Sequence, residues 1–190
     1  AAAPATAPAS AGDAAPPADL DAMIRNYAIL CGALELLPQS LGSMAIIPMQ
    51  MKMVYRIAAA HGVSLDHRNI KDFIATLGVG LASQYFESFG RKLLGGLLKK
   101  GLGSTAGKVG KAGASVAMSF AVTYAMGQVA RQYYASGRRM DKATLRQAYD
   151  HSLGQARGMQ AQVMPMIEKQ AASLNTTSIM NMIRGQQPGF

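Results

Sequence analysis

Residues 36–62, LLPQSLGSMAIIPMQMKMVYRIAAAHG, are the stretch on which the fold depends. The stretch is long and apolar, but prolines at positions 38 and 48 interrupt it. Because proline cannot continue a helix, Pro38 is expected to end a first helix that begins near residues 18–20. Pro48 suits the first turn of a second helix over residues 47–61, with Gly62 as its C-terminal stop. The two prolines therefore predict a helical hairpin, which fits either a membrane or the interior of a helical domain.

The second predicted helix carries a stripe of methionines. Met49 and Met53 are four residues apart and continue into Ile57, which places them on one apolar face. Such a face is either flexible core packing or a partner interface. Lys52 and Arg56 share another face as like charges, which an acidic group is expected to relieve.

Glu35 is the only charged residue between Arg25 and Lys52. We predict that it is a buried ionisable group, because an acid in an apolar setting is a functional candidate. A structural pairing with a nearby cation, Arg25, Lys52 or Arg56, is the alternative.

Small residues mark two later segments as sites of close helix packing. Gly78 and Gly80 lie in a third predicted helix that starts near Ser64 or Asp66, and glycines at this density let another helix approach. Residues 101–113 are expected to form a glycine-rich loop. Residues 112–130, which include Gly113 and Gly127, form a run of 19 uncharged residues. This length fits both a membrane-spanning helix and a packed core helix, and the sequence leaves both open.

The fold class follows from these helical patterns. We predict an all-α protein, with helical hairpins or a bundle of about five helices. Residues 1–17 are rich in Ala and Pro and are expected to be a disordered linker. Residues 18–170 are expected to form a single helical domain, in which Asp141 caps the last long helix, and residues 171–190 a weakly ordered C-terminal tail.

Basic residues dominate the middle of this 190-residue chain, whose net charge is +9. From Arg91 to Arg146 there are eleven Lys and Arg residues and one acid, Asp141. Such a surface suits anionic lipid, nucleic acid, an acidic partner protein or plain solvent exposure. We discount nucleic acid because few aromatic residues accompany the cations. The residues predicted to contact anionic lipid are Arg91, Lys92, Lys99, Lys100, Lys108, Lys111, Arg138 and Arg139.

The sequence contains no convincing catalytic motif. In GLGSTAGKVG, residues 101–110, Leu102 stands where a phosphate-binding loop needs its first glycine, and Val109 replaces the hydroxyl residue that holds magnesium. The three histidines are not spaced as metal ligands on one helix face. The single cysteine, Cys31, lies in an apolar run and is expected to be a buried, inert thiol. We therefore predict a protein that is not an enzyme and that carries no metal or cofactor.

The order of these features resembles that of a known family. An apolar segment with a proline, a Gly-rich helix, and the helix AGASVAMSFAVTYAMGQVARQYYASG follow one another over about residues 25–155. This order resembles the GTPase-associated, YcjF-like family of unknown function. The residues that carry the resemblance are Pro38, Gln50, Met53, Ile57, Ala58, Gly62, Thr123, Gly127, Tyr133, Tyr134 and Gly137. A departure is that no Asp follows the Pro38 region.

The resemblance implies an α-helical, membrane-associated domain. We expect a non-enzymatic scaffold or adaptor that attaches to anionic lipid through its apolar helical hairpins and its basic surface, at the bacterial inner membrane facing the cytoplasm. A GTPase is the protein partner that the resemblance implies. The alternatives are a cytoplasmic helical module that forms a homo-oligomer or binds another protein, and a helical pocket for an apolar ligand such as a lipid. No GTP-binding motif is present, so GTP chemistry is not carried over.

Overall fold

The structure is a computed structural model that describes residues 17–66, 68–70, 73 and 104–184. Within that part the labelled helices are α1 (Pro17–Leu34), α2 (Gln39–Ala60), α4 (Ser104–Ala135), α5 (Lys142–Ser173) and α6 (Thr176–Ile183). No strand occurs among the described residues. The prediction of an all-α bundle is confirmed. Of the linker predicted over residues 1–17, residues 1–16 lie outside the described residues, and Pro17 is the first residue of α1. Gly78 and Gly80 also lie outside the described residues.

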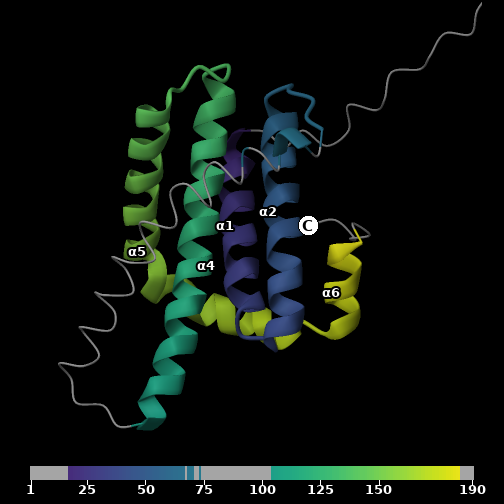
Figure 1. Ribbon diagram of the computed structural model, residues 1–190, viewed down its shortest axis with the longest axis vertical. Helices are drawn as coiled ribbons and strands as arrows, with labels where there is room; N and C mark the ends of the chain where they lie inside the picture. The colour runs from purple at the N-terminus through teal and green to yellow at the C-terminus, as the bar shows by residue number, and fades with distance from the viewer. Residues whose placement is uncertain (1–16, 67, 71–72, 74–103, 185–190) are drawn as a thin grey trace, which may run out of the picture.

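The long helices form an up-and-down bundle (Figure 1). α1 lies beside α4 and runs antiparallel to it, α2 flanks α1, and the first half of α5 flanks α4. α5 then bends, and its second half crosses the end of the bundle near the α1–α2 turn (Figure 1). The helix contains Gly154, Gly158 and Pro165, which are the residue types at which helices bend. α6 ends the described chain beside α2.

The start of α2 differs from the sequence prediction. The helix begins at Gln39 directly after Pro38, and Pro48 lies in its interior. Proline at this position has no N–H for the carbonyl of Met44, a loss that costs an exposed helix about 3 kcal/mol. The neighbours Ala45 and Met49 are buried, so packing against the bundle keeps the helix continuous through the proline. The expectation that Pro48 marks a helix start was therefore wrong.

The start of α4 also differs. The structure places Ser104–Gly113, predicted as part of a glycine-rich loop, in the first turns of α4. Alanine and lysine favour helix, and the long segment that follows extends it, so the glycines do not stop it. The uncharged run of residues 112–130 lies wholly within α4, where Val116, Phe120 and Met126 are buried in the core. None of the helices in the described ranges has the length and hydropathy needed to cross a bilayer.

Two glycines close helices and one aspartate caps a helix, each through local hydrogen bonds. Gly62 has φ of 70°, and the N–H of Val63 donates to the carbonyl of Ala58 at 2.9 Å, which closes α2 in the left-handed turn that glycine favours. Gly137, with φ of 68°, closes α4 in the same way. The Asp141 carboxylate accepts a hydrogen bond from the Thr144 N–H at 2.8 Å and caps α5. The predictions for Gly62 and Asp141 are confirmed.

The core fills the space between α1, α2, α4 and α5. Ile24, Leu34, Phe120 and Tyr149 are among its largest buried side chains. α6 falls in the predicted C-terminal tail, where it buries Ile179 and Met182 and packs against α2. The helix is capped by Asn175, whose side-chain oxygen accepts from the Ser178 N–H at 2.8 Å.

Candidate functional site

The interface between α1 and α4 has polar contacts at both ends and a close packing contact between them. We call it the α1–α4 seam. On α4 its residues recur every four positions, so each neighbours the next in a row that is inclined to the helix axis. They are Ser115, Ser119, Thr123, Gly127 and Arg131.

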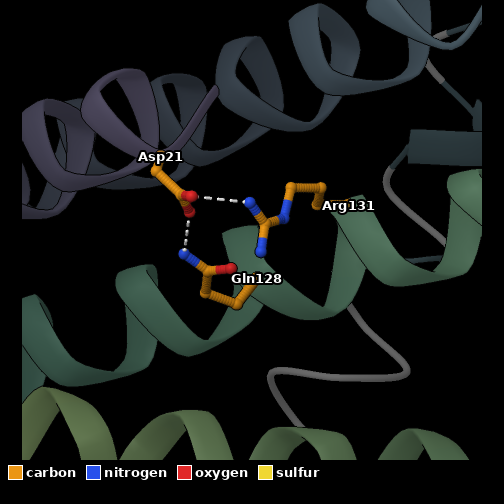
Figure 2. A network of polar contacts seen from close by, with 3 residues as sticks. All are labelled: Asp21, Gln128 and Arg131. Atoms are coloured by element: carbon orange, nitrogen blue, oxygen red, sulfur yellow. Dashed lines mark hydrogen bonds and ion pairs between the residues drawn. The ribbon is translucent and has the colours of Figure 1, made fainter. Parts of the chain in front are cut away.

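At one end of the seam, Asp21 of α1 joins two α4 side chains (Figure 2). Gln128 Nε2 donates to one carboxylate oxygen of Asp21 at 2.8 Å, and the Arg131 guanidinium pairs with the other at 2.7 Å. Burial raises the pKa of the Asp21 carboxyl, but the Gln128 hydrogen bond and the Arg131 charge outweigh burial and hold the pKa below its usual value. This network fixes where the start of α1 meets the end of α4.

At the other end, Glu35 accepts two short hydrogen bonds. The hydroxyls of Ser115 and Ser119 donate to its two carboxylate oxygens, each at 2.6 Å. Glu35 was predicted to be buried, whereas the structure leaves it half-buried. Its partners are these serines and not the cations of the alternative pairing. Both acids of the seam are therefore used to join α1 to α4.

Between the two ends, glycine permits a close approach. A Cβ built on Gly127 would lie 2.6 Å from Ile24 Cγ2 and 3.1 Å from the sulfur of Met53. Only a residue without a side chain fits there. Gly127 and Met53 were predicted to lie at a helix-packing or partner interface, and the structure uses both for contacts within the chain.

A buried polar pair joins α2 to α4. Gln50 Nε2 donates to Thr123 Oγ1 at 3.0 Å, and both residues are buried. Nearby Cys31 is fully buried, and burial raises the pKa of its thiol to about 12. A thiol in this state is not a nucleophile at neutral pH, in line with the inert role expected for it.

The other predicted site residues fall into three groups. Met49 is buried in the core, like Met53, whereas a Cβ on Gly113 would have no neighbour within 4 Å. Arg138 and Arg139 are exposed in the turn between α4 and α5, where Arg138 has φ of 64°. The remaining predicted lipid-contact residues are not described: Arg91, Lys92, Lys99 and Lys100 lie outside the described residues, as do the side chains of Lys108 and Lys111.

The α2 helix has an exposed apolar face that was not predicted from the sequence. Met44, Ile47 and Tyr55 are 60%, 57% and 51% exposed, and half-buried Met51 lies between them. These four residues, which we call the outer α2 face, are spaced at three and four positions and so share one side of the helix. Since Met49 and Met53 on another side are buried, α2 is apolar on two sides. The spacing of Met44, Ile47, Met51 and Tyr55 is the sequence signal that indicates this second apolar side.

A groove lies beside this face, between α2, the segment after it, and α6. Its volume is about 470 Å³. Its lining residues are Pro48, Met49, Met51, Lys52, Tyr55, Leu65, Asp66, Ile70, Met182 and Ile183. Among the described residues, no cluster of His, Cys, Asp and Glu is arranged to hold a metal ion.

The chain was compared with family models, curated proteins and solved structures. No family model, curated protein or solved structure matches the chain. The resemblance to the YcjF-like family stays a prediction from the sequence.

Proposed function

We propose that this protein is a non-enzymatic scaffold or adaptor that attaches peripherally to an anionic membrane surface through the outer α2 face. The observation that carries the proposal is the exposure of Met44, Ile47 and Tyr55 on a helix whose other side is already buried in the core. A helix that is apolar on two sides is expected to have a second apolar neighbour.

The charges on α2 favour lipid as this neighbour. No acid occurs in Gln39–Ala60, and the helix carries two cations, Lys52 and Arg56, both half-buried. Apolar side chains flanked by cations are typical of helices that lie in the interface of an anionic bilayer. Each cation near such a surface contributes about 1 kcal/mol. The exposed Arg138 and Arg139 would add to this attraction where they reach the surface.

The test is sedimentation of the purified chain with vesicles. Phosphatidylcholine vesicles are compared with vesicles that also contain phosphatidylglycerol, at low salt and at 0.5 M salt, since salt screens exposed charges. We expect binding to the anionic vesicles that salt weakens. The double variant Met44→Gln/Ile47→Gln is expected to stay in the supernatant.

The matched control is Met166→Gln, which changes a methionine of α5 that is 49% exposed and borders Asn26 and Leu30 of α1. It is expected to bind vesicles like the wild type. Equal binding by the α2 double variant would refute the proposal, and so would a wild-type chain that ignores anionic vesicles. If that chain is also a discrete oligomer by sedimentation velocity, the outer α2 face is a contact between copies instead. Partnership with a GTPase, which the resemblance implies, stays a prediction.

A further inference from the structure

The groove between α2 and α6 has the character of a ligand site. Its lining is apolar except for Lys52, Asp66 and the hydroxyl of Tyr55. A volume of about 470 Å³ lies within the range of small-molecule sites. Three of the lining side chains are methionines, Met49, Met51 and Met182, whose flexible thioethers adapt to a ligand of irregular shape.

Lys52 is the cation of this lining, and it has no carboxylate partner among the described residues. Loss of solvation lowers the pKa of the Lys52 ammonium, and the like charge of Arg56 lowers it further. In the part of the chain that the structure describes, no carboxylate is within ion-pair distance of Lys52. The acid of the groove, Asp66, accepts a hydrogen bond from the Asn69 N–H at 2.8 Å and caps the next turn. An anionic group placed at Lys52 would supply the missing charge partner.

An apolar groove with one cation fits a molecule that has one apolar chain and one anionic head. We propose that the groove binds a single long-chain fatty acid, with its hydrocarbon chain along the Met and Ile side chains and its carboxylate at Lys52. This proposal rests on the proposed membrane role, because the membrane would be the source of the fatty acid. A peptide partner would need hydrogen-bonding groups for its backbone, and the apolar lining offers few.

The binding test uses the full chain and monomeric ligand, without a bilayer. Fluorescence of cis-parinaric acid, kept below its aggregation concentration, is followed on addition of protein and is then displaced by oleate or by oleyl alcohol. We expect saturable binding and displacement by oleate. Lys52→Gln is expected to weaken oleate binding about tenfold, since a charge-assisted hydrogen bond is lost, and to leave the alcohol unchanged. Lys142→Gln, which alters an exposed cation of α5, is the matched control.

A second variant tests the apolar part. Met51→Trp places a large ring in the groove and is expected to abolish binding, whereas Met166→Trp on α5 is expected to have no effect. Circular dichroism establishes that each variant is folded. Absence of saturable binding by the wild type would overturn the proposal, as would unchanged binding by Lys52→Gln or by Met51→Trp.

The two proposals fail in distinguishable ways. A chain that binds anionic vesicles but not monomeric oleate retains the membrane role and loses the ligand site. A chain that binds oleate through Lys52 but not vesicles retains the site and loses the membrane role.

Discussion

Replacement of Gly127 by alanine tests whether the close approach of α1 and α4 depends on this residue. In an exposed helix the change would stabilise the protein by about 1 kcal/mol, because alanine is the better helix former. At position 127 the new Cβ would lie 2.6 Å from Ile24 Cγ2 and 3.1 Å from the sulfur of Met53, whereas ordinary contact begins at 3.4 Å.

The neighbours have little freedom to move away. Ile24 and Met53 are both fully buried, and a β-branched isoleucine in a helix has one strongly preferred rotamer. Overpacking of this kind costs about 1–3 kcal/mol. With two side chains blocked we take the upper half of that range. The net result is a loss of about 1–2 kcal/mol in the free energy of unfolding.

Gly113 provides the matched control on the same helix, since a Cβ there has no neighbour within 4 Å. Gly113→Ala is expected to stabilise the protein by about 0.5–1 kcal/mol. The two alanine variants should therefore differ by about 2 kcal/mol in urea unfolding followed at 222 nm. For a chain of this size that corresponds to about 4–8 °C in Tm.

The cause is tested with a double variant. Ile24→Ala alone is expected to cost about 2–5 kcal/mol, but it removes the side chain that blocks position 127. In that background Gly127→Ala should cost much less than in the wild type, because only the contact with the Met53 sulfur at 3.1 Å remains close. If Gly127→Ala is as stable as Gly113→Ala in the wild-type background, the reasoning about the seam is refuted.

Three further predictions follow from the polar groups. Asp21→Asn is expected to lower the free energy of unfolding at pH 7 by less than about 1 kcal/mol, because the carboxylate is 48% exposed. The fold lowers the pKa of Asp21 below 3.8, so its contribution is present above that pH and is lost as the pH falls through the lowered, folded value. The difference in the free energy of unfolding between wild type and variant should therefore shrink in urea unfolding as the pH is taken below 3.8, and a difference that widens in acid would contradict this. Thr123→Val leaves buried Gln50 without its acceptor and is expected to lower the free energy of unfolding by about 1–3 kcal/mol. Adding Gln50→Leu should recover part of that loss. If chemical denaturation shows that the costs of the two single variants simply add, a direct hydrogen bond is contradicted. The Cys31 thiol, fully buried and with its pKa raised to about 12, should react with a disulfide reagent at pH 8 only after unfolding, so that rapid labelling of the native chain would contradict its burial.

Local signals in the sequence predicted the helices and several of their ends. Gly62 and Asp141 act through hydrogen bonds to residues within five positions, so their roles can be read from the neighbouring sequence. Pro48 misled the prediction because its local cost is outweighed by the burial of its neighbours in the bundle. Such a tertiary effect has no signature in the residues next to the proline.

The candidate sites were harder to predict because they join distant segments. Asp21 and Arg131 are 110 positions apart, and Glu35 and Ser119 are 84 apart. Polar and small residues at every fourth position from Ser115 to Arg131 could have indicated the seam face of α4, but not the α1 residues opposite it. The groove depends on where α6 packs, which the weak pattern of the last residues did not reveal.

The polar ends of the α1–α4 seam limit how the bundle can move. A slip of one helical turn, about 5.4 Å, would part Asp21 from Arg131 and would break at least one of the two hydrogen bonds between Glu35 and its serines. These contacts therefore oppose sliding of α1 along α4. Any rearrangement that accompanies occupation of the groove is therefore expected in the segments that line it, which are α6, the groove side of α2 and the residues from Leu65 to Ile70.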